Sequence, residues 1–478
     1  MTTEIVPLCV DLDGTLLQTD LLWESAFQFL RNNPARFFDL VRWTLQGRAQ
    51  LKRQLALNSG LDVALLPLNE PLVEWLRLQK SAGRPLILCT AADQQLALQI
   101  ADRVDLFEEV LASDGHLNLK GSKKAALLYQ RFGNLFDYAG NSLSDQKIWN
   151  ICRNIIAVRA PWWLIPSLRK TGRLEATFSN KLSWAFILRR TLRMHQWSKN
   201  VLIFTPLLAS HRLYEPGRLR PVLLSAIAFS LIASATYMAN DLLDLTSDRR
   251  HSRKRFRPLA GGDFPLSLAV PFLLLLAGAG IGLSILTANR WVPLLVAGYA
   301  LTSLTYSAFW KRKVLVDVFA LSGFYTLRVI LGGVAAGVAP SGWFLSFSVF
   351  LFLSLGLAKR ATELYPLLAR TEQDIPIAGR GYRAADFLAV FSFGVAATFS
   401  SILVLALYLR SPEVRILYKR PEILMGLFPL VLFWLMRVWM KAGRGELHDD
   451  PIIFALKDRL TWLLGAVGLL ILWSSAVL

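Results

Sequence analysis

The sequence predicts a multidomain protein with an N-terminal α/β domain on a Rossmann-like parallel sheet and a C-terminal all-α polytopic membrane domain of about nine helices. Two observations predict this. A short apolar run, Val6–Val10, ends in acidic residues, as a buried strand leading into a ligand site does. From Trp197 onward, apolar runs approach the roughly 20 residues that cross a hydrocarbon core. We expect domains at 1–155, with a helical cap at about 20–80, then a linker at 156–196 and the membrane domain at 197–478.

The first strand delivers Asp11 and Asp13 at its carboxyl end, the edge where parallel sheets bind ligands. An aspartate there can attack phosphorus and form an aspartyl-phosphate, and one two residues later can act as general acid and base. Three later segments supply partners: Thr90 for a phosphoryl oxygen, Lys124 to neutralise the transferring group, and Asn141 with Asp145 for Mg²⁺.

In this order the four segments resemble the motifs of the haloacid dehalogenase (HAD) superfamily of aspartate-nucleophile phosphatases, over about residues 5–160. The resemblance implies that Asp11 is the nucleophile and Asp13 the acid and base. It also implies that Thr90 and Lys124 bind phosphate and that Asp145 belongs to a Mg²⁺ site. The fourth motif commonly begins Gly-Asp but here reads Gly140-Asn141, so one metal ligand would be neutral. A catalytic domain and a degenerate, structural one both stay open. A cap would favour small substrates or headgroups.

The segment 156–196 interleaves Trp162, Trp163 and Trp184 with arginines and lysines. Aromatic rings flanked by cations suit a helix at an anionic membrane surface. Nucleic-acid binding would give a similar pattern, but this segment leads directly into apolar runs. We therefore expect a membrane interface and no nucleic-acid partner.

The apolar runs also predict the orientation of the protein. The net charge is +19, and the loops on the side of the N-terminal domain carry 18 Lys and Arg residues against 8 on the other side. The positive-inside rule then predicts an integral membrane protein whose N-terminal domain and active sites are cytoplasmic. Three cysteines in a cytosolic domain argue against structural disulfides. The predicted spans lie near 198–212, 221–239, 264–288, 291–309, 314–338, 342–358, 387–409, 421–440 and 460–477.

An acidic stretch follows the second of these runs. Asn240, Asp244 and Asp248 stand four residues apart, so that they share one helical face, with Asp241 one step round. Acids at a membrane boundary need cations, and Mg²⁺ shared with a diphosphate would supply them. A solvated helix end is the structural alternative. The basic run that follows could hold the rest of an anionic substrate through Lys254, Arg255 and Arg257.

Other polar residues stand in or beside apolar runs. Arg328 lies inside one, where a charge usually faces a cavity or a partner, and a structural ion pair is the alternative. The remaining candidates for substrate binding stand at the ends of runs: Tyr306, Lys311, Asp317, Lys359 and Arg360. For Lys359 and Arg360, a solvated loop is the alternative.

Together, Trp197–Asn200 with Lys199, Asn240–Asp248 and Tyr306–Asp317 resemble the UbiA superfamily of intramembrane prenyltransferases, over roughly residues 190–478. Typical members use two aspartate-rich motifs, but here the second is reduced to Asp317 with Lys313 before it. That departure, with the segments Lys254–Ala260 and Gly323–Gly333, is similar to the branch typified by decaprenyl-phosphate phosphoribosyltransferase. This resemblance implies phosphoribosyl pyrophosphate (PRPP) as donor and a polyprenyl phosphate as nucleophile.

The leading prediction is therefore a bifunctional membrane enzyme with Mg²⁺ in both domains. Its membrane domain would transfer 5-phosphoribose from PRPP to polyprenyl phosphate with release of pyrophosphate, and its HAD domain would remove the 5-phosphate. One alternative is an aromatic prenyltransferase with an attached, degenerate HAD domain. Another is a lipid-binding membrane scaffold without chemistry.

Overall fold

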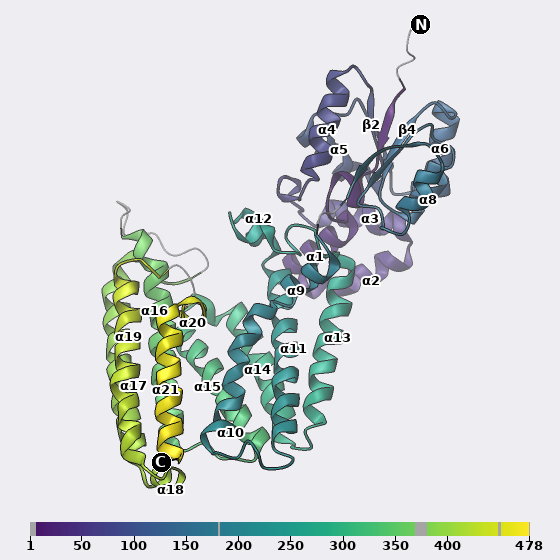
Figure 1. The fold of residues 1–478 in the computed structure, drawn as a ribbon. Helices are drawn as coiled ribbons and strands as arrows, with labels where there is room; N and C mark the ends of the chain where they lie inside the picture. Colours follow the sequence, from purple (N-terminus) through teal and green to yellow (C-terminus); the bar gives the residue numbers. More distant parts are fainter. Residues whose placement is uncertain (1–5, 180–181, 369–379, 448–450, 478) are drawn as a thin grey trace. The chain divides into compact units, whose positions relative to one another are not determined.

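The computed structural model describes residues 6–179, 182–368, 380–447 and 451–477. The chain forms two compact units, Met1–Leu192 with Met238–Leu273, and Arg193–Tyr237 with Leu274–Leu478. Helices α11 (Leu219–Leu243) and α13 (Leu266–Ile285) contribute residues to both units (Figure 1). The acidic stretch and the basic run after it therefore fold as part of the first unit.

The first unit is built on a six-stranded sheet in the order β3-β2-β1-β4-β5-β6, in which every neighbouring pair is parallel. The central strand β1 pairs with β2 on one side and β4 on the other, so that Leu8 lies opposite Leu86 and Asp137. The predicted parallel α/β domain is confirmed. The strands are β1 (Leu8–Val10), β2 (Leu86–Asp93), β3 (Glu109–Ser113), β4 (Asp137–Gly140), β5 (Ile155–Val158) and β6 (Leu174–Phe178).

Helices cover both faces of this sheet, because alternate side chains of a strand point to opposite faces. Leu8 and Val10 pack in one core with α4 (Glu70–Ser81) and α5 (Gln94–Val104). Cys9 packs in the other core, with helices on the opposite face (Figure 1). These helices are α6 (Ser122–Phe132), α7 (Gln146–Trp149) and α8 (Ile165–Lys170). The cysteines Cys9, Cys89 and Cys152 are buried and free.

The sheet continues past residue 155 into the segment predicted as a linker, which is a correction. Ile155–Val158 is an uninterrupted apolar run, and all four residues are buried, as expected of an inner parallel strand. A linker was predicted here because tryptophans and cations surround this apolar run. Of the segment 156–196, α9 (Trp184–Thr191) keeps the amphipathic character that was expected, with Ile187 buried and its arginines exposed.

The predicted cap is a small helical layer between β1 and β2. Helices α1 (Leu21–Asn32), α2 (Phe37–Leu45) and α3 (Arg48–Asn58) share a core of their own, formed around Phe29, Trp43 and Leu55. The next helix, α4, packs on the sheet instead.

Among the described residues, seven helices are long and apolar enough to cross a membrane, so the count of about nine is not confirmed. The segment 198–212 forms two short pieces, η5 (Met194–Phe204) and α10 (Thr205–Ala209). Helix α14 (Trp291–Ala308) has 18 residues but includes Thr, Ser and Tyr, and it is not one of the seven. The seven are Leu219–Leu243, Leu266–Ile285, Val316–Ala336, Gly342–Leu367, Ala384–Leu409, Pro421–Gly443 and Arg459–Val477.

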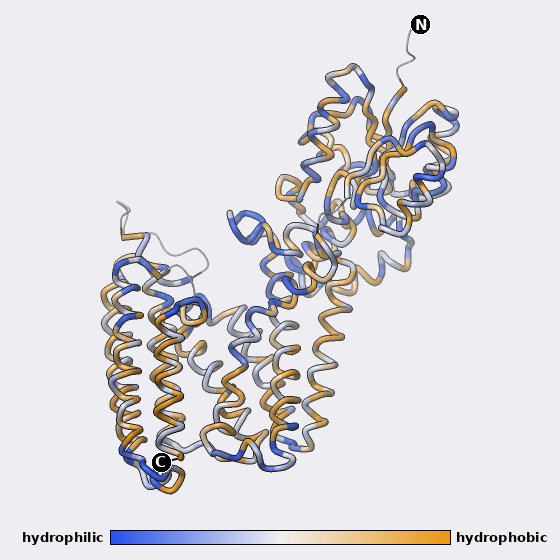
Figure 2. Tube along the Cα trace, viewed as in Figure 1, coloured by the Kyte–Doolittle hydropathy of each residue, from blue (hydrophilic) through white to orange (hydrophobic). Residues whose placement is uncertain are grey.

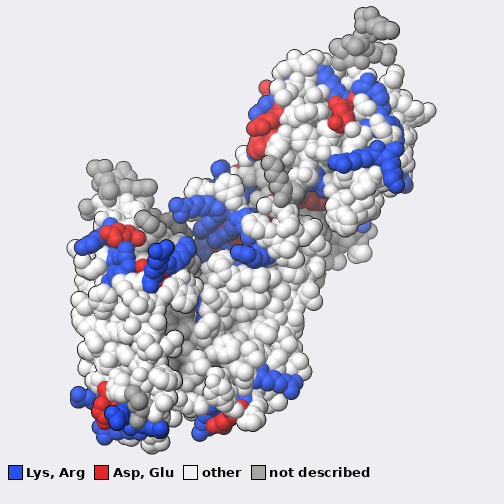
Figure 3. All heavy atoms as spheres, in the orientation of Figure 1, with Lys and Arg blue, Asp and Glu red and all other residues white. Residues whose placement is uncertain are grey.

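The second unit is a bundle of these helices. It contains α15 (Val316–Ala336), α16 (Gly342–Leu364), α17 (Phe387–Leu409), α18 (Pro412–Leu417), α19 (Leu427–Gly443), α20 (Pro451–Lys457) and α21 (Arg459–Val477). The long helices are mostly hydrophobic along their length (Figure 2). On the face of the bundle that Figure 3 shows, Lys and Arg gather at the two ends, with a largely uncharged band between. This is the pattern of a membrane-spanning bundle.

Close backbone packing places η5 against α15 in this unit. A Cβ atom at Gly332 would fall 1.9 Å from the carbonyl oxygen of Ile203, so no larger residue fits there without a shift. This approach places the residues of η5, including Lys199 and Asn200, beside the middle of α15.

Candidate functional site

The first candidate site lies at the carboxyl edge of the sheet in the first unit. Asp11 directly follows β1, and its backbone N–H donates to the carbonyl of Ala139 at 2.9 Å. The next residues form one wide turn, η1 (Leu12–Leu16), with i→i−5 hydrogen bonds. Gly14 in this turn has φ +72°, and a Cβ atom there would fall 2.1 Å from Asn141 Nδ2. Only glycine therefore lets the Asn141 amide lie over the turn.

Asp11 forms a buried ion pair with Lys124. The Lys124 Nζ donates to Asp11 Oδ1 at 2.7 Å, to the Cys89 carbonyl at 3.0 Å and to the Tyr138 hydroxyl at 3.0 Å. These three bonds satisfy the ammonium group. Burial raises the pKa of Asp11 to about 6, and the Lys124 charge opposes this rise. Burial disfavours the charged form of Lys124, but Asp11, Cys89 and Asp145 together outweigh it and raise the pKa of Lys124.

The pKa of Asp13 is raised further than that of Asp11. Its Oδ1 accepts from the backbone N–H of Leu21, the first residue of α1, at 2.8 Å. Burial, and then the charge of Asp20, raise the pKa of Asp13 to about 8, although the Leu21 N–H opposes this. A carboxyl group that keeps its proton near neutral pH can donate it to a leaving oxygen. Asp11 and Asp13 thus differ in pKa, as a nucleophile and a general acid need to.

Asp145 organises the loop that carries Asn141. Its Oδ2 accepts from the backbone N–H groups of Asn141 and Ser142 at 3.1 and 2.9 Å, and from Ser142 Oγ at 2.9 Å. Its Oδ1 accepts from the Tyr138 hydroxyl at 3.1 Å. The predicted metal ligand Asp145 therefore already has a positioning role, and Asn141 faces the site.

Thr90, predicted to bind phosphate, is fully buried within β2, and its Oγ1 accepts from the Ala92 N–H at 3.0 Å. The residues of β2 that line the cavity over Asp11 are Ala91, Ala92 and Asp93. This cavity has a volume of about 470 Å³.

The cap supplies two cations to this cavity that the sequence prediction missed. Lys52 Nζ donates to the Ala91 carbonyl at 2.5 Å and to Asn118 Oδ1 at 3.3 Å, and Arg48 lines the same cavity. Burial lowers the pKa of Lys52, while Asp13 and Asp20 oppose this. Arg48 and Lys52 stand four apart on α3, and this spacing could have identified them.

Within the described residues, no group of three or more His, Cys, Asp or Glu side chains converges as a metal site. Mg²⁺ usually keeps several waters and needs one or two carboxylates with substrate phosphate oxygens. Asp11 and the amide oxygen of Asn141, which line the same cavity, are hard oxygen donors of this kind. The residues therefore fit Mg²⁺ shared with a phosphate ester.

The second candidate site is the acidic stretch. Helix α11 ends at Leu243, and α12 (Leu245–Arg250) follows after Asp244. The four-residue spacing persists through this break, because Asp244 N–H donates to Asn240 O and Asp248 N–H to Asp244 O, both at 2.8 Å. Asp241 and Asp248 are buried and converge on one cation, Arg257. Its Nη1 lies 3.0 Å from Asp241 Oδ1 and 2.6 Å from Asp248 Oδ2, whereas Lys254 and Arg255 are exposed.

The helix α12 is fastened to the cap by a buried ion pair. Arg249 donates to Glu24 through Nη1 at 2.9 Å and Nη2 at 2.5 Å, and its Nε donates to the Ala260 carbonyl at 3.1 Å. Glu24 also accepts from Thr19 Oγ1 at 2.6 Å. The acidic stretch and the cap of the Asp11 site are thus parts of one folded body.

In the second unit, Arg328 is buried inside α15. Its Nε donates to Asn200 Oδ1 at 2.9 Å, and its Nη1 donates to the Phe324 carbonyl at 2.6 Å. The guanidinium lies 4.6 Å from the ring centre of Phe229 and 5.6 Å from those of Tyr299 and Tyr325. In the part of the chain that the structure describes, no carboxylate lies within ion-pair distance of it. The described residues therefore do not form the structural ion pair that was the alternative for Arg328.

Two further predicted residues, Lys199 and Tyr306, lie near the rings around Arg328. Lys199 Nζ lies 5.6 Å from the ring centre of Tyr325, and Tyr306 packs against Phe324 with ring centres 5.7 Å apart. Lys313 is exposed, and Lys311 and Lys359 are half-buried.

Asp317 and Arg360, by contrast, pair with each other. Both are fully buried, and Arg360 Nε lies 2.8 Å from Asp317 Oδ2. The Tyr382 hydroxyl donates to Asp317 Oδ1 at 2.6 Å, and Arg380 Nη1 lies 3.5 Å from Oδ2. Tyr382 and Arg380 were missed, because nothing local in the sequence links them to residues more than sixty positions away.

A model of the UbiA prenyltransferase family matches residues 201–457, which is more than half of the chain. The chain belongs to the UbiA prenyltransferase family. With seven described helices of membrane-spanning length, this UbiA-family protein is a multi-pass membrane protein.

The chain is similar to decaprenyl-phosphate phosphoribosyltransferase of Corynebacterium glutamicum, at 35% identity over 178 residues, which cover 37% of this chain and 54% of that protein. It is similar over nearly its whole length to uncharacterized protein y4nM of Sinorhizobium fredii, at 37% identity, covering 97% of this chain and 89% of the relative. A phosphoserine phosphatase structure with bound substrate matches 37% of this chain and 95% of its own, with 12% identity and a TM-score of 0.28.

The buried Asp317–Arg360 pair yields a stability prediction. Asp317→Asn removes the buried carboxylate that pairs with Arg360 Nε and leaves Arg360 paired with Glu363, and breaking a buried pair typically costs about 3–5 kcal/mol. We expect a clear fall in the thermal unfolding temperature of the detergent-solubilised protein. Glu446→Gln is the control, since Glu446 pairs with Lys441 at an exposed site and the change should cost less than about 1 kcal/mol. Equal unfolding temperatures for the two variants would contradict a structural role for Asp317.

Proposed function

We propose that this protein transfers 5-phosphoribose from PRPP to a polyprenyl phosphate, releasing pyrophosphate, and then removes the 5-phosphate from the lipid product. The observation that supports the transfer most directly is Arg328, a buried cation bonded to an amide and surrounded by rings rather than paired with an acid. Such a cation suits a phosphate nucleophile better than a neutral aromatic acceptor. The pairing of Asp317 with Arg360 agrees with this proposal, because an aromatic prenyltransferase would need a second acidic motif that is free.

In the transfer step, Asn240, Asp241, Asp244 and Asp248 would hold the Mg²⁺-bound diphosphate of PRPP. When bound, Mg²⁺ would supply charge neutralisation to the leaving pyrophosphate. Lys254, Arg255 and Arg257 follow the acids and would bind the donor's other phosphate. Arg328 and Lys311 would position the lipid phosphate, whose oxygen attacks the ribose C1 as the bond to pyrophosphate breaks. Catalysis is then mainly alignment and charge neutralisation.

In the phosphatase step, an Asp11 carboxylate oxygen would attack the phosphorus of the 5-phosphate. Asp13 would give its proton to the departing ribose oxygen and then take one from the water that hydrolyses the aspartyl-phosphate. Lys124 would offset the charge of the transferring group. Asn141, with Asp11, would hold Mg²⁺, which would polarise the phosphoryl oxygens when bound.

We also propose that the first unit faces the cytoplasm. The exposed cations of the run 249–257 are those that the positive-inside rule weighs most, because they flank two helices of membrane-spanning length.

Asp244→Asn should reduce the transfer of labelled ribose phosphate from PRPP to extracted lipid by on the order of 100-fold or more, because it removes one charge that stabilises the transition state. Asp39→Asn is the control, since Asp39 is an exposed acid on α2 outside the site. Both variants should remain folded. Near-normal transfer by Asp244→Asn would refute the role of the acidic stretch.

Asp11→Asn should leave lipid labelling intact and make the 5-phosphorylated lipid accumulate, because an amide cannot form the aspartyl-phosphate. The measurement is chromatography of lipids made from labelled PRPP, with Asp105→Asn as a control. If the unmodified protein released only phosphorylated lipid at saturating Mg²⁺, the Asp11 site would not be a product phosphatase. Equal loss of lipid synthesis would instead assign it a structural role.

Cysteines introduced at Arg253 and Arg415 should be labelled from opposite sides of the membrane, the former from the cytoplasm. Both positions are exposed, and the three native cysteines are buried and should give little background. Five helices, α13 to α17, lie between them, and labelling from opposite sides requires all five to cross, including α14, which is not one of the seven helices above. Labelling from the same side would show that α14 or another of the five does not cross.

A further inference from the structure

Two cavities of the first unit meet at the same acidic residues. The smaller contains Asp11 and Lys124. The larger has a volume of about 930 Å³, and both are lined by Asp13, Asp20 and Asn141. A small sugar phosphate needs no more than the smaller cavity, because about 300–1,000 Å³ suffices for an entire small ligand. The larger cavity is therefore space for a second part of a longer substrate.

Aromatic rings form part of the wall of the larger cavity. Trp162, Trp163, Trp184, Phe178 and Phe264 line it, and the side chains of Trp162 and Trp163 are 82% and 51% exposed. Trp184 packs against Phe264 with ring centres 6.5 Å apart. Exposed indoles on a cavity wall offer a large contact area to an apolar ligand.

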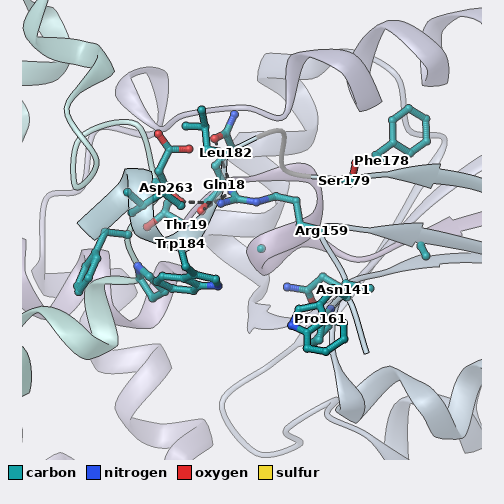
Figure 4. A pocket seen from close by; sticks show the side chains of 18 of the residues that line it. Gln18, Thr19, Asn141, Arg159, Pro161, Phe178, Ser179, Leu182, Trp184 and Asp263 are labelled. Atoms are coloured by element: carbon teal, nitrogen blue, oxygen red, sulfur yellow. Dashed lines mark hydrogen bonds between the residues drawn. The ribbon is translucent and has the colours of Figure 1, made fainter. Parts of the chain in front are cut away.

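Cations accompany these rings. Arg159 lines the cavity and has the uncommon backbone φ of +47°. Figure 4 shows its side chain running across the cavity toward Gln18, and it donates to the Gln18 carbonyl at 3.1 Å and the Gly262 carbonyl at 2.9 Å. Arg169 is a second cation of the lining, and Asp263 is an acid there. A guanidinium fixed among aromatic rings suits a ligand that joins a phosphate to an apolar chain.

The residues of one cavity wall lead directly into a helix of membrane-spanning length. Gly262 to Ser267 line it, and α13, which starts at Leu266, is one of the helices long and apolar enough to cross a bilayer. A lipid chain that leaves the bilayer beside α13 would reach this wall first.

We propose that the larger cavity binds the phosphodiester and the first isoprenoid units of a lipid-linked pentose 5-phosphate, while its 5-phosphate reaches Asp11. This rests on the proposed phosphatase function and narrows its substrates to membrane-anchored phosphate monoesters. The reaction is a hydrolysis, in which the bond between phosphorus and the ribose 5-oxygen breaks and water supplies the new oxygen of inorganic phosphate.

The test compares two esters with the full-length protein in detergent, a farnesyl-phosphoryl-ribose 5-phosphate and free ribose 5-phosphate. In Trp162→Ala/Trp163→Ala, the ratio of kcat/KM for the lipid ester to that for the free ester should fall by on the order of tenfold or more, as on loss of aromatic anchors. The matched control is Phe37→Ala/Phe38→Ala, which removes two aromatic rings of the same unit that are 53% and 80% exposed and lie outside both cavities. Its ratio should stay unchanged.

A second measurement does not depend on turnover. Retention of the labelled lipid ester by immobilised protein carrying Asp11→Asn should weaken by a similar factor when the two tryptophans are replaced, and not when the two phenylalanines are. If the protein is an active phosphatase and the tryptophan changes leave the ratio of kcat/KM values unchanged, the assignment of the larger cavity is wrong. The phosphatase function would not be affected by that result. A protein that hydrolyses neither ester but retains the lipid through these tryptophans would overturn the phosphatase and support the cavity.

Discussion

The buried ion pair between Glu24 and Arg249 is the interaction on which the arrangement of the first unit depends. It joins the cap of the Asp11 site to the helix that follows the acidic stretch, across 225 residues of sequence. Both side chains are almost completely buried, so removing one partner would leave a costly charge behind. Because Arg249 stands next to Asp248 in α12, the same pair also fixes the direction of the acidic stretch.

Two other contacts also join the segment that follows α12 to the rest of the first unit. Arg159, at the end of β5, donates to the Gly262 carbonyl, and a Cβ atom at Gly262 would fall 2.7 Å from the Gln18 carbonyl oxygen. The loop after the basic run thus packs directly on the turn that follows Asp13. These contacts bury Leu259, Ala260 and Phe264 in one core with Ile187. The segment Met238–Leu273, which lies within the UbiA family match, is therefore part of the first unit.

The sequence predicted those site residues whose position follows from their immediate neighbours in the chain. Asp11 and Asp13 could be placed because a short apolar strand precedes them, and Asn240, Asp244 and Asp248 because their spacing is helical. The convergence of Asp241 and Asp248 on Arg257 was not predictable, because it needs the chain to turn back after α12. Glu24 had no signal at all, since its partner lies on a different element far along the chain. β5 was missed because the tryptophans and arginines around a four-residue apolar run suggested a membrane surface.

The predicted count of about nine spans is not confirmed, and the first predicted span shows one physical reason. The run 198–212 is apolar enough to resemble a span, but it folds as η5 and α10 because its backbone must approach α15 at Gly332. Tertiary packing therefore overrides a hydropathy pattern that would suffice in an isolated helix.

The two buried arginines of the second unit show why a charge in an apolar helix does not by itself identify a site. Arg360 and Arg328 are equally cationic and nearly equally buried. Arg360 is neutralised by Asp317, so bringing an anion to it would require breaking a pair that already compensates its burial. Among the described residues, Arg328 is compensated by an amide, a carbonyl and three aromatic rings, all of which leave its net charge in place. An anionic headgroup is the partner that would complete this environment, which is why Arg328, rather than Arg360, carries the proposed lipid phosphate.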